Sequence, residues 1–475
     1  MKDITEKRIS EETVFDNKKK LSQLNLFEEQ ANNIRPIHYL GSKLRLLETI
    51  SEVIDSVDAS NGTVCDLFAG SGTVANYLAE HRKVITVDIQ EYSRVLCSAL
   101  LMPQKADFSI KSFIVDIKKS VNREKLLECF EEIIQYEKNC IQYANKGNIE
   151  PLCELLDEGS IIAFEEDGGN DKQNKQSELN KILKNTLKKL DEYSMRNRPQ
   201  AMTTRYFGGQ YFSYKQAVDI DSILELVFNI EKKYRDTYLA ALISSVSDIV
   251  NTVGKQFAQP LKSRNSDGTP KKSIIKVVNR DRDIDVFKCY EKWLGIYLNN
   301  PNTKYNHKVY KADYIEALEK LGEDVKVVYA DPPYTRYHYS RYYHVLETIC
   351  LRDNPPLTMK TVKGQKRISR GLYREDRHQS PFSIKTQAYT AFENMFEKVS
   401  KIGAALILSY SPFDEAKENT PRMLTISQIE ELATKYYSNV KITSVGEFAH
   451  SKLNKNERNF EVECDAEILI ICQKN

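Results

Sequence analysis

Cysteine and histidine are too sparse in this chain to form a common metal centre. The nine cysteines are odd in number and no two are closer than eight residues, and the seven histidines also lack metal-ligand spacing. The missing CxxC pair argues against a zinc or dithiol redox site, and the odd count favours free thiols in a reducing cytoplasm. We therefore expect a mechanism without a metal.

Long apolar runs and a strong net charge are missing as well. No run approaches the roughly 18 residues of a membrane-spanning helix, and the opening MKDITEKRIS contains no apolar signal-peptide core. The net charge of +2 is nearly neutral, so any affinity for nucleic acid has to come from local basic patches. At 475 residues and 41% apolar, the chain has the composition of a globular protein with room for about two or three domains.

The order of expected helices and strands indicates an α/β fold interrupted by a helical insert. Residues 1–33 form a polar N-terminal extension, residues 34–117 and 305–475 alternate strands and helices, and residues 118–304 are mostly helical, with a polar loop at 165–178. Strands are expected at 63–68, 83–87, 308–311, 325–330, 404–410, 440–445 and 467–471. Helices are expected at 44–57, 73–81, 125–143, 181–196, 220–234 and 238–252.

The sequence Asp331-Pro332-Pro333-Tyr334 directly follows the apolar stretch 325–330, which is typical of a buried parallel strand. The Asp331 carboxylate and the Pro332 carbonyl can both accept hydrogen bonds from an exocyclic amine. Each proline fixes φ at about −65°, and Tyr334 can stack on a flat ring for about 1–3 kcal/mol per base. The alternative is a proline turn that caps a core strand, with Asp331 as an ordinary turn residue.

A glycine turn lies between the first expected strand and the following helix. In Phe68-Ala69-Gly70-Ser71-Gly72, the glycines let a ligand approach the backbone and the helix N-terminus. Asp88 ends the next strand, where an acid can accept hydrogen bonds from ribose hydroxyls. Together they predict an adenosine-containing cofactor at the carboxyl edge of a parallel sheet.

Two classes of cofactor are compatible with this turn. The spacing Gly70-x-Gly72-x-x-Ala75 also fits a nicotinamide or flavin enzyme. S-adenosylmethionine is favoured because the later Asp331 sequence suits an amine and the upstream Tyr39-Leu40-Gly41-Ser42-Lys43 suits a methionine group. There Lys43 could pair with the carboxylate and Tyr39 could lie over the group. Alternatively, Lys43 is a solvated lysine at the start of a helix.

The ordered series of these motifs resembles the Dam-like, or alpha, class of S-adenosylmethionine-dependent N6-adenine DNA methyltransferases. The series consists of Tyr39-x-Gly41-x-Lys43, Phe68-x-Gly70-x-Gly72, Asp88, Asp313-Tyr314 and Asp331-Pro332-Pro333-Tyr334. Residues 205–212, 251–254 and 343–347 are similar to the FokI-type methyltransferase subgroup. The chain departs from the class at Tyr39, where some members have tryptophan, which leaves only the stacking detail open.

The resemblance implies a fold, a cofactor and a set of site residues. The fold is a Rossmann-like, mostly parallel sheet with an antiparallel last strand, interrupted by a target-recognition insert. S-adenosylmethionine would bind Tyr39, Gly41, Lys43, Phe68, Gly70, Gly72, Asp88, Asp313 and Tyr314, with Asp88 at the ribose and Asp313 at the adenine amine. Asp331, Pro332, Pro333 and Tyr334 would hold the amine of a flipped target adenine.

Two basic stretches are candidates for contacts to DNA phosphates. Residues 262–282 contain an expected loop, and residues 352–385 carry nine Lys and Arg against three Asp and Glu. The candidate DNA-binding residues are Lys271, Lys272, Arg336, Lys363, Lys366, Arg367, Arg370 and Arg374. For each stretch the alternative is an ordinary solvated face. Residues 336–344 either line the base pocket or form a helix packed on the sheet, and 205–214 is either a DNA-facing hairpin or a surface turn.

We therefore predict a cytoplasmic, site-specific adenine-N6 methyltransferase that acts on double-stranded DNA. A cytosine 5-methyltransferase is excluded, because its cysteine nucleophile normally follows a proline and none of the 14 prolines here precedes a cysteine. A restriction–modification or phage-defence setting, with a cognate endonuclease or defence subunit as partner, follows from the resemblance alone. Methylation of cytosine N4, an RNA adenine or a glutamine amide stays open, as does a non-catalytic DNA-binding regulator.

Overall fold

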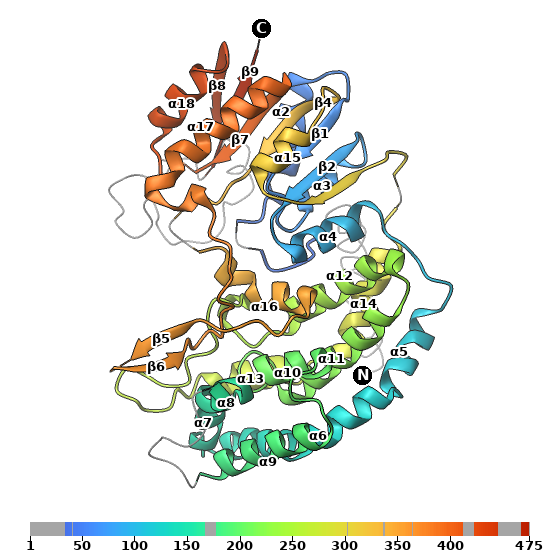
Figure 1. Ribbon diagram of the computed structural model, residues 1–475, viewed down its shortest axis with the longest axis vertical. Coiled ribbons are helices and arrows are strands. Elements are labelled where there is room, and N and C mark those ends of the chain that lie inside the picture. Colours follow the sequence, from blue (N-terminus) through green and yellow to red (C-terminus); the bar gives the residue numbers. More distant parts are fainter. Residues whose placement is uncertain are drawn as a thin grey trace, which may run out of the picture.

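The computed structural model describes residues 34–39, 41–166, 177–301, 303–335, 338–362, 364–411, 422–444 and 467–474. The expected extension 1–33, most of the expected loop 165–178, and the candidates Arg336 and Lys363 lie outside these residues. The described residues form an upper part built on a β-sheet and a lower part built of helices (Figure 1).

The upper part is organised around a sheet with the strand order β3-β2-β1-β4-β7-β9-β8 in the described residues. Strands β3, β2, β1, β4 and β7 pair in parallel, whereas β9 runs antiparallel to both β7 and β8. The strands are β1 (Thr63–Asp66), β2 (Val84–Asp88), β3 (Lys308–Lys311), β4 (Val325–Ala330), β7 (Ala405–Tyr410), β8 (Asn439–Ser444) and β9 (Ile468–Gln473). The predicted mostly parallel sheet with an antiparallel last strand is confirmed.

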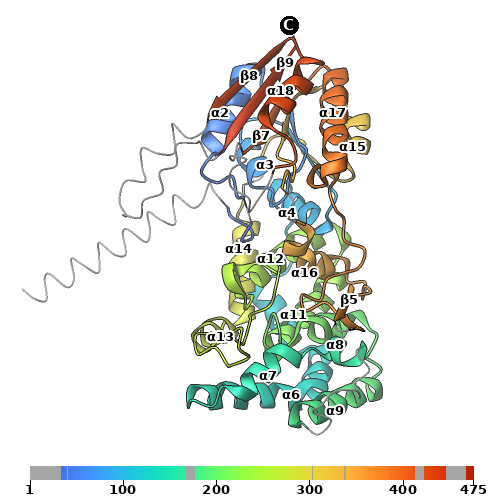
Figure 2. The ribbon, with the colours of Figure 1, turned by 90° about the vertical axis from the view of Figure 1, so that its left-hand side faces the viewer.

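Alternating side chains of the central strands enter two apolar cores, one on each face of the sheet. Val64 and Val327 face a core shared with α2 (Leu47–Val57) and α3 (Thr73–Leu78). Cys65 and Val328 face the opposite core, which α15 (Tyr314–Lys320), α17 (Lys385–Ile402) and α18 (Ile426–Thr434) complete. Figure 2 shows α2 and α17 on opposite sides of the sheet. Burial on both faces explains why these strands are short continuous apolar runs rather than alternating ones.

Helices that follow α4 (Glu91–Leu101) build the lower part (Figure 1). Ile230 has an extended backbone with ψ 164° and ends α11, so the helix expected over 220–234 is wrong at its end. The lower part consists of α5 (Ile110–Lys118), α6 (Val121–Asn145), α7 (Glu150–Glu158), α8 (Ile161–Glu166), α9 (Glu178–Glu192), η1 (Pro199–Ala201), α10 (Met202–Phe207), α11 (Tyr214–Asn229), α12 (Lys232–Ile249), η2 (Val253–Lys255), α13 (Ile274–Arg282) and α14 (Val286–Leu298).

Residues 205–214 are neither of the two structures expected for them. Their first residues complete α10, and the glycine turn that follows is buried rather than on the surface. The Tyr211 hydroxyl donates to the Phe257 and Gly371 carbonyl oxygens, at 2.9 and 3.0 Å. The glycines and aromatic residues of this segment therefore serve packing inside the helical part.

A segment from the second half of the chain leaves the sheet and packs on the helices. Helix α16 (Ser340–Leu351) lies between the upper and lower parts, and a hairpin of β5 (Met359–Val362) and β6 (Gln365–Ile368) projects from the edge of the molecule (Figure 1). Tyr343 and Leu346 of α16 share an apolar core with α4 and α12. The chain returns to the sheet through η3 (Pro381–Ser383).

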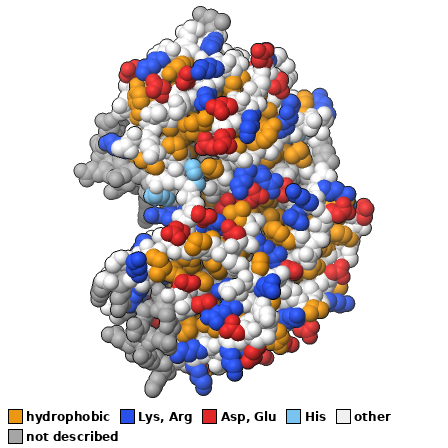
Figure 3. Space-filling view, viewed as in Figure 1, with side chains coloured by type: hydrophobic (Ala, Val, Ile, Leu, Met, Phe, Trp, Pro, Cys, Tyr) orange, Lys and Arg blue, Asp and Glu red, His pale blue; other side chains and the backbone are white. Residues whose placement is uncertain are grey.

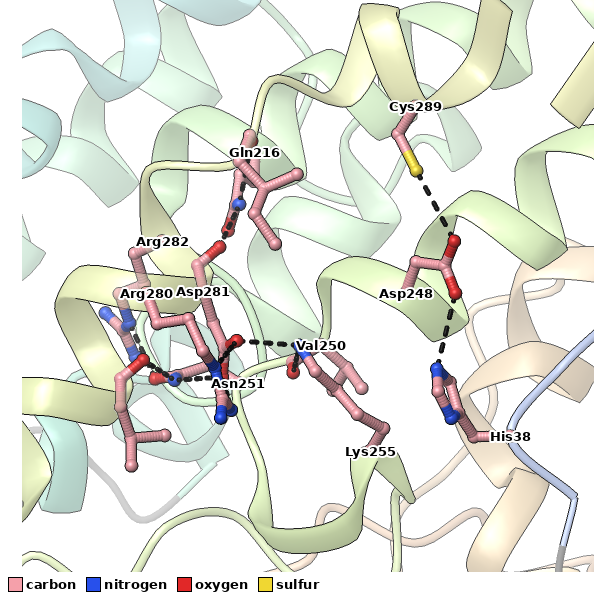
Figure 4. A network of polar contacts seen from close by, with 12 residues as sticks. His38, Gln216, Asp248, Val250, Asn251, Lys255, Arg280, Asp281, Arg282 and Cys289 are labelled. Atoms are coloured by element: carbon pink, nitrogen blue, oxygen red, sulfur yellow. Dashed lines mark hydrogen bonds and ion pairs between the residues drawn. The ribbon is translucent and has the colours of Figure 1, made fainter. Parts of the chain in front are cut away.

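Two polar networks anchor the ends of the loop that follows α12 (Figure 4). At the end of α12, Asp248 lies 3.3 Å from His38 Nε2 and accepts a hydrogen bond from Trp293 Nε1 at 2.8 Å. Beyond the loop, Lys255 Nζ lies 2.7 Å from Asp281 Oδ1 and donates to the Val250 carbonyl oxygen at 3.0 Å. The first network ties the segment that leads into Tyr39 directly to the helical part.

Candidate active site

A cleft that encloses about 1040 Å³, including its open mouth, lies at the carboxyl ends of β1, β2, β3 and β4. In the space-filling view a notch separates the upper and lower parts on the left, with histidine side chains near it (Figure 3). Of the residues predicted from the sequence, the cleft is lined by Tyr39, Gly41, Lys43, Phe68, Asp88, Asp313, Tyr314, Asp331, Pro332, Pro333 and Tyr334. A volume of this size suits a small-molecule ligand together with a base.

The glycine turn is hydrogen-bonded to Asp88, which lines the cleft, whereas Gly70 and Gly72 themselves are not among its lining residues. Asp88 Oδ2 accepts from the Gly70 amide and Oδ1 from the Gln90 amide, both at 2.9 Å. Gly70 and Gly72 have φ of 54° and 75°, and a Cβ on Gly70 would lie 2.6 Å from the Tyr39 hydroxyl oxygen. Only glycine therefore lets this turn pass beneath Tyr39 without strain.

Lys43 joins two acids at the end of the cleft nearest β4. Its Nζ lies 2.9 Å from Asp331 Oδ2 and 2.5 Å from Glu467 Oε1, and its side chain is only 8% exposed. Burial and the Glu467 charge raise the pKa of Asp331 to about 6, against the lowering effect of Lys43. Burial lowers the pKa of Lys43, but the Asp331 and Glu467 charges raise it well above its usual range. Asp331 is thus ionised near neutral pH, with a buried ammonium as its partner.

Glu467 was not predicted as a site residue. It directly precedes β9, and because β9 is antiparallel to β7, its beginning lies at the same edge of the sheet as the end of β4. An acid immediately before an apolar final strand was the signal in the sequence, but it has meaning only once the direction of that strand is known.

Asp66 is a second acid that sequence reasoning missed. It ends β1, is 2% exposed, and its Oδ2 has no hydrogen-bond partner among the described residues. Burial and the charges of Asp331 and Asp88 raise its pKa to about 8, while the Ala75 amide lowers it. It lines a smaller cavity beside the cleft, together with Tyr39 and Lys43. Like Asp88, it is an acid at the end of a strand before a turn, which is the signal that could have identified it.

Aromatic side chains form two walls of the cleft. Tyr39 stacks on Tyr343 of α16, with ring centroids 4.8 Å apart and planes 11° apart. The second wall consists of Phe68 and Tyr314, which pack on the buried Phe382 with ring centroids 5.0 to 6.0 Å apart among the three. Tyr343 belongs to residues 336–344, which the sequence left either as pocket lining or as a packed helix, and it lines the cleft. Its stacking on Tyr39 has no local signal in the sequence.

Tyr334 and Asp313 are held by their neighbours in specific orientations. The Tyr334 ring lies 4.6 Å from that of Tyr410, and the Arg422 guanidinium lies over it at 5.0 Å from the centroid. The Asp313 carboxylate caps α15 by accepting from the Ile315 amide at 2.9 Å. Both residues therefore enter the cleft from positions fixed by packing or capping.

The candidate DNA-binding residues fall into different surroundings. Lys366 is exposed and Arg367 half-buried on β6, and Lys271 and Lys272 precede α13, half-buried and exposed respectively. Arg370 donates to Asp157 Oδ1 at 3.0 Å and to the Leu261 carbonyl at 2.6 Å, which brings the two basic stretches into contact.

Arg374 requires a correction to the candidate set. Its side chain is 4% exposed, and its guanidinium donates to both carboxylate oxygens of Asp353, at 2.8 and 2.7 Å, and to Asp376. A buried arginine paired with two acids has no group left for a phosphate, so we assign it to holding the loop together.

The described residues contain no group of three or more His, Cys, Asp or Glu placed to hold a metal ion. Among the helices described, none has both the length and the apolar character needed to cross a bilayer.

Comparison with known proteins gives a consistent result. A family model described as D12 class N6 adenine-specific DNA methyltransferase matches residues 39–248 and 284–404. Modification methylase LlaI of Lactococcus lactis subsp. lactis is 25% identical over 413 residues, which is 84% of this chain and 51% of LlaI. Type II methyltransferase M.FokI of Planomicrobium okeanokoites is 24% identical over 379 residues, which is 79% of this chain and 44% of M.FokI.

A further relative matches along its whole length. Type II methyltransferase M.NlaIII of Neisseria lactamica is 22% identical over 443 residues, which is 92% of this chain and 99% of M.NlaIII. The chain thus spans about half the length of LlaI and M.FokI but nearly all of M.NlaIII. The resemblance inferred from the ordered motifs is confirmed.

Proposed function

Because this chain belongs to the D12 class of N6 adenine-specific DNA methyltransferases, we propose that it methylates the exocyclic amine of one adenine in double-stranded DNA. The observation that carries the proposal is a single cleft lined by Asp331, Pro332 and Asp88, with the glycine turn hydrogen-bonded to Asp88. Since its relatives are modification methylases, we further propose a cytoplasmic role in a restriction–modification system, with a cognate endonuclease as partner.

We propose S-adenosylmethionine as the methyl donor, and the residues of the cleft fit the parts of this molecule. Asp88 offers its carboxylate to ribose hydroxyls, and Lys43 offers a cation to the methionine carboxylate. The unpartnered Asp66 Oδ2 offers an acceptor to the ammonium group. When bound, S-adenosylmethionine supplies an electrophilic methyl group on a sulfonium. The wall of Phe68 and Tyr314, with Asp313 beside it, suits an adenine ring with its amine.

We propose that Asp331 and Pro332 hold the target amine. The adenine amine is a poor nucleophile because its lone pair is delocalised into the ring. Two hydrogen bonds, to the Asp331 carboxylate and the Pro332 carbonyl, would localise that pair and orient it, and the negative charge of Asp331 would stabilise the positive charge that develops on nitrogen. Tyr334, supported by Tyr410, would stack on the flipped base and offset part of the few kcal/mol that flipping costs.

The decisive experiment is transfer of a labelled methyl group to genomic DNA, followed by modification-sensitive sequencing. We expect N6-methyladenine within one short sequence. Label in N4-methylcytosine would mean that the target base is cytosine rather than adenine, and label in RNA would mean that the substrate is RNA rather than DNA. DNA binding with no label in any base would favour the non-catalytic regulator.

The rate of methyl transfer should fall on the acid side with a midpoint near pH 6, because Asp331 acts as an ionised acceptor and its pKa is raised to about 6. An unshifted aspartate would place this midpoint at about pH 4. The carboxylate is ionised above its pKa, so activity is retained at higher pH and lost as pH falls. This pKa is that of the free protein, so rates between pH 5 and pH 8 with DNA and donor well below saturation measure the midpoint. A rate that is flat down to pH 5 would exclude this role of Asp331.

Replacing Lys366 and Arg367 together by glutamine should weaken DNA binding and reduce its salt dependence, because β6 presents both residues at the projecting hairpin. If each contacts one phosphate, the slope of log K against log salt should fall in magnitude by about 1.8. Fluorescence anisotropy with a labelled duplex measures the slope. Lys188→Gln, which removes an exposed charge from α9, is the matched control. An unchanged slope in the double variant would remove the hairpin from the DNA surface.

A further inference from the structure

Two arginines from distant segments share one aromatic ring beside the cleft. Arg341 lies on α16, and Arg377 lies in the segment between β6 and η3. Their guanidinium carbons lie over the Tyr373 ring, at 5.6 and 4.7 Å from its centroid. The Tyr373 hydroxyl donates to the Ala258 carbonyl, and its ring meets that of His344 edge-on at 5.1 Å. The ring beneath both arginines is therefore held from two sides.

Neither arginine has satisfied its buried nitrogen atoms. Arg341 Nε, Arg377 Nε and Arg377 Nη1 are buried and have no hydrogen-bond partner among the described residues. The nearest acid in the sequence, Asp376, instead accepts from Arg374 at 3.0 and 2.9 Å. Burial lowers the pKa of Arg377, and the Arg341 charge lowers it further. Buried donors without acceptors and two like charges on one ring are both costly, and an anion would relieve both costs.

The arginine pair borders the cleft on the side of the catalytic loop. His338, three residues before Arg341, lines the cleft, and the Arg341 and Arg377 charges add to burial in lowering its pKa. His378, which directly follows Arg377, also lines the cleft. An anion on the pair would therefore lie next to whatever occupies the space in front of Asp331.

We propose that Arg341 and Arg377 together bind one backbone phosphate of DNA, next to the adenine that enters the cleft. The proposal rests on the proposed function and specifies which part of the substrate this surface takes. A guanidinium presents a planar fork of donors that matches a phosphate, and the Tyr373 ring orients both forks in advance. Gripping the phosphate beside a flipped nucleotide would hold the rotated backbone in place.

The first test measures DNA binding and its salt dependence for Arg341→Gln, Arg377→Gln and the double variant. Because one arginine can still neutralise a shared phosphate, each single variant should lower the magnitude of the slope of log K against log salt by less than about 0.9, and the double variant should lower it by about 0.9. A fall of about 1.8 in the double variant would mean two separate phosphates and overturn the shared site. Lys188→Gln, far away on α9, should leave the slope unchanged.

The second test locates the phosphate with chemically modified DNA. Duplexes are prepared with one neutral methylphosphonate at each backbone position around the target adenine. One position next to that adenine should weaken binding by wild-type protein by roughly tenfold and should have no further effect on the double variant. Additive losses at every position would overturn the proposal. If wild-type protein and the double variant bind DNA equally well, and only wild-type protein binds inorganic phosphate, the pair would be a site for a free anion instead.

Thermal melting separates this role from a structural one. Removal of two unpaired like charges should leave the melting temperature unchanged or raise it, whereas a structural pair would lower it. A marked drop in both single variants would overturn the proposal. If wild-type protein methylates no DNA, the proposed function fails; if it methylates DNA and the double variant keeps the wild-type slope, only the arginine site fails.

Discussion

Replacement of Asp331 by alanine should reduce methyl transfer by about 10²- to 10³-fold while DNA binding and donor binding persist. The variant loses an ionised acceptor that we place against the reacting amine, and loss of one such electrostatic contact typically costs this much. Its effect should fall on the rate of the chemical step rather than on binding, since Lys43, Asp88 and the aromatic walls stay in place. A single-turnover assay with labelled donor, together with equilibrium binding of DNA and donor, separates the two.

Two further variants make this experiment decisive. Asp331→Asn retains the shape and one carbonyl acceptor but loses the charge, so it should keep a residual rate above that of alanine. Asp267→Ala, in an exposed turn where the carboxylate accepts only from Thr269, should keep the wild-type rate. Methylation by Asp331→Ala at the wild-type rate would contradict the proposed reaction itself.

Replacement of Lys43 by methionine should have the second-largest effect, on both stability and rate. The variant leaves Asp331 and Glu467 facing each other without the ammonium that lies 2.9 and 2.5 Å from them. Removing one partner of a buried ion pair typically costs about 3–5 kcal/mol, so the midpoint of chemical denaturation should fall clearly. The rate should also fall at neutral pH, because the pKa of Asp331 loses its lowering influence.

The direction of the pH effect distinguishes this prediction from simple unfolding. Since the pKa of Asp331 rises above about 6 in the variant, its acid limb should move to higher pH and part of the rate should return as the pH is raised. Lys83→Met removes a more exposed partner of Asp324 from the same sheet and should change stability by less than about 1 kcal/mol, with an unchanged pH profile. An acid limb at the wild-type position in Lys43→Met would show that Lys43 does not control Asp331.

The sheet could be predicted from the sequence because its strands carry a strong local signal. The expected strands 308–311 and 325–330 coincide with β3 and β4, and the others differ from the structure by a few residues at their ends. The ends of helices were harder to predict from the sequence, because the apolar pattern continues across the extended Ile230 that separates α11 from α12. The burial of residues 205–214 could not be predicted from the sequence either, since glycines and aromatic residues suit a surface turn and a packed turn equally well.

The site was predictable to the extent that it follows strand ends. Asp88, Asp313 and Asp331 come at or just after the ends of β2, β3 and β4, and parallel strands bring such ends to one edge. Glu467 escaped because its place depends on the direction of β9. Tyr343 lies within residues 336–344, for which the sequence offered a place in the pocket lining, and it does line the cleft. His378 escaped because it comes from a segment that leaves the sheet and returns, and no local pattern specifies where such a segment returns.

The pairing of β1 with β4 also has a consequence for how the chain is made. Val64 lies opposite Val327, and all the helices from α5 to α14 are synthesised between them. At roughly 5–20 residues per second, a ribosome synthesises β4 tens of seconds after β1. During this time the edge of β1 that pairs with β4 has no partner, while the helical part folds. β4 then pairs with β1 after the helices have folded. We expect mutations in α12 to lower the yield of active enzyme during expression more than they lower the stability of the finished protein.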